Sequence, residues 1–190
     1  MIQRDFFPAT DQAFAAGYAY EPEFLCAAEE ERLIGEIARL PLAQAEYKGF
    51  LAKRRIVSYG GRYDFSARRL HTGEPIAPFL LPLRAKAAAW AGCSADDFTH
   101  ALIAEYPPGS QLGWHRDVPE FELVVGVSLV GPCRMRFRRY PPHSRAKSIA
   151  LELEPRSIYR LAGEVRWEWQ HSVPPVPALR YSITFRTLRK

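Results

Sequence analysis

The chain has 190 residues, of which 47% are hydrophobic, 13% aromatic and 25% charged. This composition excludes a disordered chain, and the length fits one buried core, so we expect residues 1–190 to form a single domain. No segment offers the roughly 18 apolar residues of a membrane-spanning helix, and the first residues lack the apolar run of a signal peptide. We therefore expect a cytoplasmic protein without a membrane partner.

The charge balance is basic, with 26 Lys and Arg against 21 Asp and Glu, a net charge of +5 and a pI near 9.2. A basic surface favours a polyanionic partner such as nucleic acid. A merely soluble, slightly basic surface has the same charge, so composition alone leaves both alternatives open.

Two helices are expected in the N-terminal half. Apolar residues recur at helical spacing within residues 20–41, and Pro41 ends the pattern. A second helix is predicted over residues 78–91, and it should end there because Gly92 is typical of the position just after a helix. Both helices could cover one face of a sheet.

From Thr99 onward, short runs of β-branched and aromatic residues alternate with turn sequences such as PPG and PPHS. Many short strands at this spacing are typical of a sandwich, barrel or jelly roll. Because the helices come first and the strands follow, we predict an α+β protein with a mainly antiparallel sheet. The expected strands cover residues 100–106, 124–130, 134–139, 148–153, 157–161 and 181–187.

The segment GWHRDVP contains a candidate metal site. In an extended segment His115 and Asp117 point to the same face, and His171 in WEWQHSVPP could add a third ligand from a neighbouring strand. Two histidines and one carboxylate on one face suit non-haem Fe(II), because three coordination positions stay open. Taken alone, an HxD pair is weak evidence, since a single histidine is usually a hydrogen-bonded surface or core residue.

The C-terminal segment RYSITFR alternates between polar and apolar residues. Without a metal site, the polar face would be an ordinary exposed strand face. Beside a metal site, two inward arginines suit a dicarboxylate, because the planar guanidinium binds a carboxylate through two hydrogen bonds. The polar face consists of Arg180, Ser182, Thr184 and Arg186.

Through YPPGSQLGWHRD, SLVGPCRMRF, WQHSV and RYSITFR, the sequence resembles the AlkB family of Fe(II)- and 2-oxoglutarate-dependent dioxygenases over roughly residues 20–190. The resemblance implies a double-stranded β-helix, a jelly-roll form, as the catalytic core in about residues 99–190. It also implies N-terminal helices packed on the sheet and a substrate lid in about residues 1–98.

The same resemblance implies roles for individual residues. The cofactors would be Fe(II), 2-oxoglutarate and O2. Arg180 would pair with the distal carboxylate of 2-oxoglutarate, and Arg186 would lie close to the metal. The implied catalytic iron ligands are His115, Asp117 and His171, and the implied 2-oxoglutarate contacts are Tyr106, Arg180, Ser182 and Arg186.

A candidate lid over residues 47–71 interleaves aromatic residues with arginines. Aromatic rings can stack on an extruded base while arginines hold phosphates, which makes Tyr59 and Tyr63 candidate substrate contacts. The alternative is a β-hairpin with one packed aromatic side and one solvated charged side. Nucleobase-repair members often carry an acidic substrate contact where this chain has Pro119, so Glu120, the next residue, is a third candidate.

The strand sequence CRMRFRR places Arg134, Arg136 and Arg138 on one face, with Met135 and Phe137 on the other. The arginine face could line a phosphate groove. It could equally be an exposed strand face whose charges discourage aggregation.

We therefore expect an AlkB-like dioxygenase of the DNA-repair type, which demethylates alkylated DNA or RNA bases oxidatively and needs no obligate protein partner. Two alternatives stay open. The same chemistry could act on a protein side chain or a small molecule, or the chain could be a catalytically silent module that binds nucleic acid.

Overall fold

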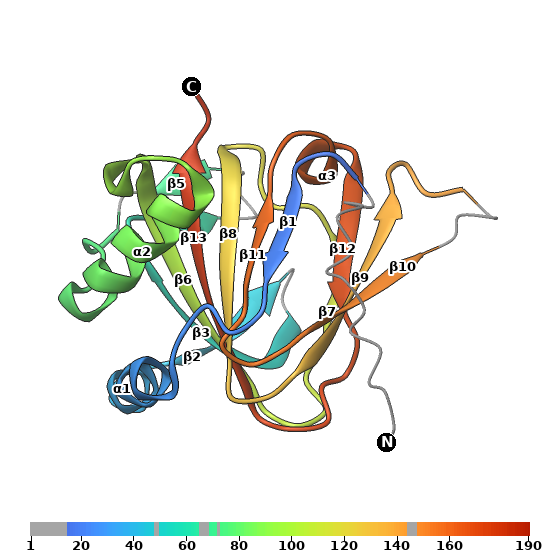
Figure 1. The fold of residues 1–190 in the computed structure, drawn as a ribbon. Coiled ribbons are helices and arrows are strands. Elements are labelled where there is room, and N and C mark those ends of the chain that lie inside the picture. Colours follow the sequence, from blue (N-terminus) through green and yellow to red (C-terminus); the bar gives the residue numbers. More distant parts are fainter. Residues whose placement is uncertain (1–14, 48–49, 65–68, 72, 144–147) are drawn as a thin grey trace, which may run out of the picture.

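The computed structural model describes residues 15–47, 50–64, 69–71, 73–143 and 148–190, which form two main antiparallel sheets that face each other and a separate two-stranded ribbon (Figure 1). Helices lie on the outer side of the larger sheet, and the smaller sheet closes the opposite side of the barrel. Within these ranges, no helix combines the length and apolar character needed to cross a lipid bilayer.

The larger sheet has seven strands, and each of its described pairings is antiparallel. Period-two alternation gives the central strands one face toward the helices and one toward the barrel interior. In sheet order the strands are β1 (Tyr18–Glu21), β11 (Ile158–Leu161), β8 (Phe121–Leu129), β13 (Arg180–Leu188), β6 (Phe98–Tyr106), β3 (Phe50–Tyr59) and β2 (Ala43–Tyr47).

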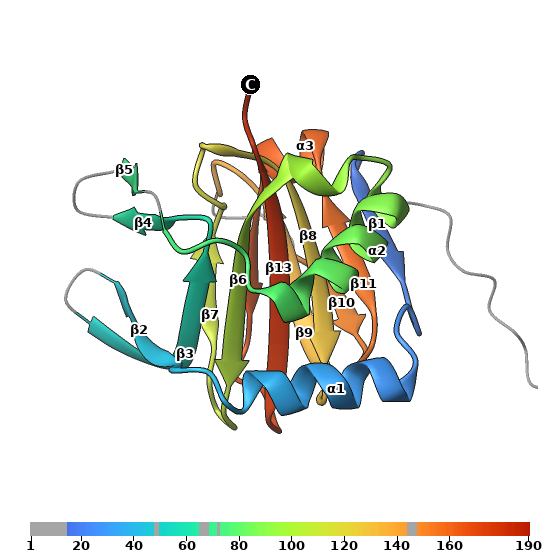
Figure 2. The same cartoon turned by 90° about the vertical axis from the view of Figure 1, so that its left-hand side faces the viewer.

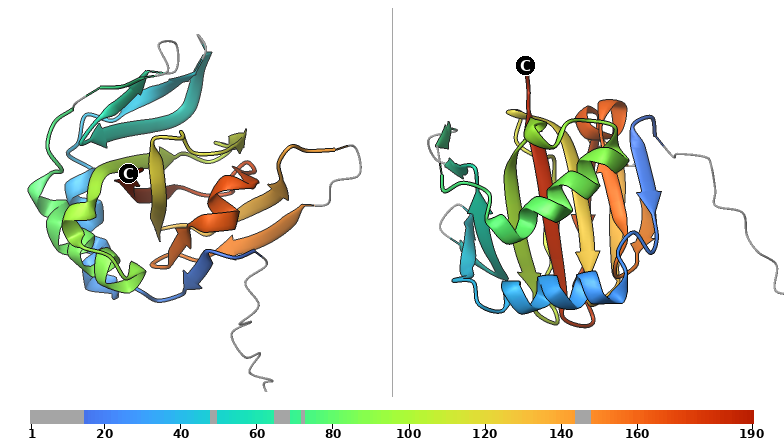
Figure 3. Two further views of the ribbon diagram at one scale, coloured as in Figure 1. Left: turned by 90° about the horizontal axis from the view of Figure 1, so that it is seen from above. Right: turned by 60° about the vertical axis from the view of Figure 1, so that its left-hand side comes forward.

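The smaller sheet has four strands, and the view from above in Figure 3 shows it facing the larger one. Its order is β10 (Ile149–Leu153), β9 (Cys133–Arg139), β12 (Trp169–Val173) and β7 (Leu112–His115). From β6 onward the chain places β6, β8, β11 and β13 in one sheet and β7, β9, β10 and β12 in the other. This connectivity is a jelly roll, so the predicted α+β class and double-stranded β-helix are confirmed.

Two helices cover the outer face of the larger sheet (Figure 2). α1 (Ala27–Ile37) begins where the Glu29 carboxylate accepts the backbone N–H of Cys26 at 2.8 Å. α2 (Leu81–Ala91) ends at Gly92, whose φ of 74° lies in the left-handed region that glycine adopts without strain. The shorter helical elements are η1 (Pro78–Leu80), η2 (Ala95–Asp97) and α3 (Gly163–Trp167).

The main apolar core lies between these helices and the larger sheet. Leu33 and Ile37 of α1 and Leu83 of α2 are buried in one cluster with Ile183 and Phe185 of β13. Each such side chain contributes about 1.5–3 kcal/mol when fully buried. This core fixes β13 in position, and the other face of β13 points into the barrel.

The N-terminal half contains sheet strands in addition to the expected helices and candidate lid. The first expected helix is shorter than residues 20–41, because β1 occupies the segment to Glu21 and Glu23 has a left-handed φ of 53°. β1, β2 and β3 also belong to the larger sheet. This sheet therefore contains residues from both the expected N-terminal part, about 1–98, and the expected jelly-roll core, about 99–190. Beyond β3, the candidate lid contains a two-stranded ribbon, β4 (Arg62–Asp64) and β5 (Arg69–His71).

A glycine in β8 makes room for an aromatic ring inside the barrel. Gly126 pairs with Tyr159 of β11, and a Cβ atom built on Gly126 would lie 2.2 Å from Cζ of Tyr159. Only a residue without a side chain therefore allows the Tyr159 ring to lie across β8.

Candidate metal centre

His115, Asp117 and His171 come together between the two sheets. His115 ends β7, and His171 lies directly opposite it on β12. One ligand atom from each of the three residues lies within 4.8 Å of the others, and the two imidazole centroids are 4.2 Å apart. The spacing in the sequence thus brings three possible metal ligands to one place.

Hydrogen bonds and ion pairs occupy one side-chain atom of His115 and one of Asp117, and they leave the other atom of each residue free to bind a metal. His115 Nδ1 lies 2.9 Å from the carbonyl oxygen of Gly113, so Nδ1 carries the proton and Nε2 keeps its lone pair. Oδ1 of Asp117 accepts a hydrogen bond from Nε of Arg186 at 3.0 Å and forms an ion pair with Nη2 at 3.0 Å, whereas Oδ2 lies 3.7 Å from Nε2 of His171. The remaining nitrogen and oxygen donors fit a non-haem Fe(II) site.

Charge and burial hold the triad in the protonation states that metal binding requires. Burial, followed by the neighbouring His115, lowers the pKa of His171 to about 3. Burial also lowers the pKa of His115. Burial alone would raise the pKa of Asp117, but Arg186 and both histidines lower it well below its usual range. At neutral pH the site therefore contains two neutral imidazoles and one carboxylate.

The buried His100 contacts Arg186, which in turn holds the carboxylate of Asp117. Arg186 Nη1 lies 3.3 Å from Nδ1 of His100, and Nε2 of His100 lies 3.0 Å from Oγ of Ser58, which donates to the carbonyl oxygen of Gly61 at 2.6 Å. Because arginine only donates, Nδ1 of His100 accepts and Nε2 carries the proton. The sequence gives no local sign of this role, because His100 reaches Arg186 only through the pairing of β6 with β13.

Arg166 of α3 holds the loop that follows Asp117. Its Nη2 donates to the carbonyl oxygens of Val118 at 2.7 Å and Phe121 at 2.8 Å. The side chain is buried, and this burial lowers its pKa despite the opposing attraction of Asp117. The two bonds fix both ends of the loop and so limit the directions in which Asp117 can point.

Arg180 begins β13 and points into the barrel with only 2% of its surface exposed. Its Nε donates to Oγ of Ser128 at 3.1 Å, and its Cζ lies 5.1 Å from the ring centroid of Tyr106, its partner in the ladder. Ser182 follows on the same inward face, opposite Ala104. Within the described chain, no hydrogen bond uses the Nη groups of Arg180, so they remain available to a carboxylate.

Arg54 on β3 also faces the barrel interior. Its Cζ lies 5.8 Å from the centroid of Tyr106, and its charge adds to the effect of burial in lowering the pKa of His115. Its Nε is buried and has no hydrogen-bond partner among the described residues. The next residue, Arg55, points the other way and donates to the carboxylate of Glu105 at 2.7 and 2.8 Å.

The three predicted substrate contacts lie in different surroundings. Tyr59 packs against the core beneath the helices, on the face of the sheet away from the triad. The side chain of Tyr63 lies outside the described residues. Glu120 lies in the loop after Asp117, and its Oε2 is buried without a partner in the described parts of the chain. Glu120 therefore stays a candidate, whereas the position of Tyr59 is that of a core residue.

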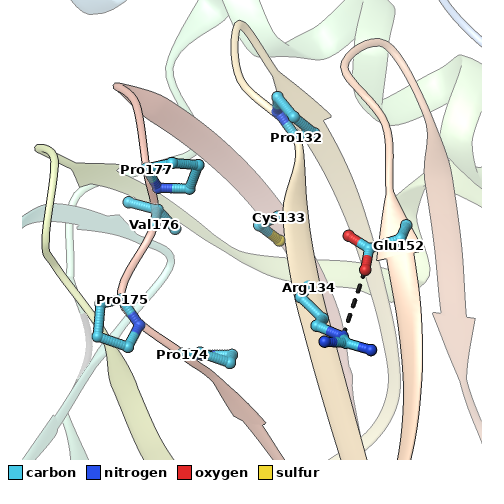
Figure 4. Close-up of a pocket in the computed structure, with 8 residues that line it drawn as sticks. All are labelled: Pro132, Cys133, Arg134, Glu152, Pro174, Pro175, Val176 and Pro177. Carbon is cyan, nitrogen blue, oxygen red and sulfur yellow. Dashed lines mark ion pairs between the residues drawn. The ribbon is translucent and has the colours of Figure 1, made fainter.

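A pocket of about 200 Å³ lies elsewhere, beside the segment that follows β12 (Figure 4). Arg134 and Glu152 form an ion pair at 3.3 Å on its wall. The lining residues are Pro132, Cys133, Arg134, Glu152, Pro174, Pro175, Val176 and Pro177. None of the triad residues is among them, so this pocket is separate from the candidate metal centre.

Comparison with known proteins gives this site a family. Residues 39–186 match the 2OG-Fe(II) oxygenase superfamily, and the chain belongs to it. Within this superfamily the chain is AlkB-like. It is 30% identical over 176 residues to the Alkylated DNA repair protein ALKBH8 homolog of Arabidopsis thaliana, an alignment that covers 80% of this chain and 49% of that protein. The chain thus spans about half the length of this relative.

Solved structures show the same fold at low sequence identity. OsALKBH1 matches with a TM-score of 0.69 and 14% identity, over 93% of this chain and 99% of that chain. A Pseudomonas putida prolyl-4-hydroxylase matches with a TM-score of 0.59 and 17% identity, over 92% and 93% of the two chains. The superfamily uses Fe(II), 2-oxoglutarate and O2, and the donor set of the triad fits such an iron site.

Proposed function

We propose that residues 1–190 form one catalytic domain that removes alkyl groups oxidatively from nucleic acid bases. The observation that carries this proposal is the His115, Asp117 and His171 cluster, with ligand atoms within 4.8 Å, inside a barrel of the 2OG-Fe(II) oxygenase superfamily. These residues would bind Fe(II). With 2-oxoglutarate and O2, the iron would supply the oxidant for hydroxylation of a substrate C–H bond, while 2-oxoglutarate becomes succinate and carbon dioxide.

Four further residues would bind and orient the co-substrate. The buried fork of Arg180 would hold the distal carboxylate of 2-oxoglutarate, since an arginine matches a carboxylate through two hydrogen bonds. Tyr106 and Ser182 lie beside it on the inward face. Arg186, which already holds Oδ1 of Asp117, would keep that carboxylate oriented and meet the keto acid end.

Alkylated DNA or RNA is the proposed substrate class. The name of the Arabidopsis relative refers to repair of alkylated DNA, the chain carries a net charge of +5, and Arg54 is turned toward the barrel interior. On an N-methyl group, the hydroxylated product collapses to formaldehyde and the free amine. We place the protein in the cytoplasm as part of the same proposal, and cell fractionation tests that location.

The test is an anaerobic titration of metal-free protein with Fe(II) and 2-oxoglutarate, followed by the visible charge-transfer band of the chelated keto acid. We expect the band in wild type, its loss in His115→Ala, and a higher 2-oxoglutarate requirement in Arg180→Lys. Methylated single-stranded oligonucleotides should then release formaldehyde. A folded wild type without the band contradicts the dioxygenase assignment; a band with no turnover of any methylated oligonucleotide contradicts the substrate.

Pro119 favours a second candidate, the same chemistry on a protein side chain or a small molecule. It occupies the position at which nucleobase-repair members often contact the base through an acidic residue. Turnover of methylated peptides without turnover of oligonucleotides would favour this candidate. A catalytically silent binding module is opposed by the complete triad, and it requires that His115→Ala leave every measured effect unchanged.

A further inference from the structure

The outer face of the smaller sheet carries arginines that the proposed reaction does not use. On β9, Met135 and Phe137 are buried in the barrel, so Arg136 and Arg138 point outward. On β7, His115 points inward and Trp114 outward. The indole of Trp114 lies beneath both arginines, with Cζ of Arg136 5.1 Å and Cζ of Arg138 4.4 Å from its ring centroid.

The two guanidinium groups are held in place by neutral partners on β12. Nε of Arg136 donates to Oγ of Ser172 at 3.2 Å, and Nε of Arg138 donates to Oε1 of Gln170 at 2.9 Å. Together with the indole ring, these bonds fix the guanidinium planes. In the described part of the chain, no hydrogen bond uses their Nη groups, and both side chains remain partly exposed.

The other arginines of β9 are paired with glutamates, whereas Arg136 and Arg138 form no described ion pair. Arg134 is paired with Glu152 at 3.3 Å, and Arg139 is paired with Glu164 and Glu168 at 2.7 and 2.8 Å. No described salt bridge involves Arg136 or Arg138. Two positive charges thus remain uncompensated at the centre of this face.

A third arginine extends the positive face toward the metal centre. Arg116 lies between His115 and Asp117 in the sequence, its Cζ is 3.9 Å from the ring centroid of Tyr140, and its Nη1 donates to the carbonyl oxygen of Trp167 at 2.9 Å. We name Trp114, Arg116, Arg136, Arg138 and Tyr140 the Trp114 patch. It lies on the reverse side of the segment that provides two of the three candidate iron ligands.

We propose that the Trp114 patch binds the phosphate backbone of a single-stranded nucleic acid whose target base enters the candidate site. The proposal rests on the proposed function. Arg136 and Arg138 are two residues apart on one strand, about 6.8 Å, which suits successive phosphates of an extended strand. Fixed guanidinium groups bind phosphates with little loss of side-chain entropy, and here the rings beneath them and the bonds to β12 already hold them in place.

The experiment measures fluorescence anisotropy of unmethylated single-stranded oligonucleotides, one of 5 and one of about 20 nucleotides, at several salt concentrations. Arg136→Ala/Arg138→Ala is compared with Arg134→Ala, a matched control on the same strand whose charge is already paired with Glu152. We expect the double variant to bind the longer oligonucleotide about tenfold more weakly. The slope of log binding constant against log salt concentration should become shallower by roughly 1.4, or about 0.7 for each lost phosphate contact. The control should change little.

The outcomes separate this proposal from the proposed function. Equal affinity of wild type and double variant, together with formaldehyde release from methylated oligonucleotides, overturns the patch and leaves the function standing. Wild type that binds no oligonucleotide overturns the patch, whereas the absence of formaldehyde release from methylated oligonucleotides overturns the proposed function. Polyglutamate that competes as well as the oligonucleotide, with the same loss in the double variant, shows an acidic-protein surface and overturns the nucleic-acid assignment. An unchanged Fe(II)–2-oxoglutarate charge-transfer band confirms that the variants are folded.

Discussion

Arg186 on the larger sheet contacts Oδ1 of Asp117, which follows the last residue of β7 in the smaller sheet by two positions. Its Nε donates a hydrogen bond of 3.0 Å, and its Nη2 forms an ion pair at 3.0 Å. This contact links the two sheets at the candidate metal centre. It occupies one carboxylate oxygen and leaves Oδ2 beside His171. Arg186 thus acts on the metal through the orientation and charge of Asp117.

Arg186→Met should lower the affinity for Fe(II) by about 10- to 100-fold, the range typical for loss of a residue that orients a metal ligand. The measurement is an anaerobic competition titration against a chromogenic chelator. Arg55→Met is the matched control, because it removes a similar arginine–carboxylate pair, with Glu105, on a different part of the sheet. Equal losses of affinity in both variants would show that general destabilisation, not Asp117, is the cause.

The buried histidines predict how the stability of the metal-free protein depends on pH. The pKa of His100 is lowered to about 3 by burial and then by Arg186, and that of His171 also lies at about 3. An unfolded chain binds protons at these histidines near pH 6.5, whereas the folded chain does not. Their stabilising contribution is therefore complete above pH 6.5 and is lost as the pH falls toward 3.

Urea unfolding at pH 7, 6 and 5 measures this effect. Well below pH 6.5, each such histidine should lower the free energy of unfolding by about 1.4 kcal/mol per pH unit. His100→Gln keeps an acceptor for Arg186 but cannot be protonated. Its free energy of unfolding should therefore fall less steeply than that of wild type, by about 1.4 kcal/mol per pH unit. His143→Gln, at an exposed position, should follow wild type. Parallel curves for wild type and His100→Gln would mean that folded His100 binds the proton.

Much of the barrel could be predicted because its strands follow period-two alternation. The RYSITFR alternation places Arg180 and Ser182 inward and Ile183 in the core, as the structure has them. The proximity of His115 and Asp117 follows from the same geometry. The roles of these residues in binding iron and 2-oxoglutarate stay predictions.

The rest depends on contacts between distant residues, which leave no local pattern. The pairing of β3 with β6 includes the ion pair of Arg55 with Glu105, 50 positions apart. Alternation puts Trp167 on the same side as His171, but α3 runs to Trp167 and interrupts the extended backbone. The loop clamp of Arg166 and the support of Asp117 by His100 are likewise single long-range contacts.

Gly126→Ala should destabilise the protein by roughly 1–3 kcal/mol, because the new methyl group overlaps the buried Tyr159 ring. The Tyr159 side chain is close enough to Arg180 to share an electrostatic interaction with it, so the affinity for 2-oxoglutarate should fall too. Gly113→Ala is the control, since a Cβ atom there meets no atom within 4 Å. A double-mutant cycle with Tyr159→Leu tests the cause: if Gly126→Ala costs as much in that background, the ring is not the obstacle.

Arg54 gives the most specific prediction about the substrate. Its Nε is buried without a described partner, and its Cζ lies 5.8 Å from the Tyr106 centroid. A buried N–H group that stays unpaired costs about 1–3 kcal/mol, which a substrate oxygen would recover on binding. Arg54→Met should therefore leave stability unchanged or raise it, while the KM for a methylated oligonucleotide rises roughly tenfold.

Steady-state formaldehyde release, with 2-oxoglutarate and oligonucleotide varied separately, distinguishes the possible roles of Arg54. We expect only the oligonucleotide KM to change, with the charge-transfer band of the Fe(II)–2-oxoglutarate complex as in wild type. Lys53→Met, a change at an exposed neighbour on the same strand, should alter neither constant. A higher 2-oxoglutarate KM in Arg54→Met would instead assign this arginine to the co-substrate, because Arg54 and Arg180 both lie near the ring of Tyr106.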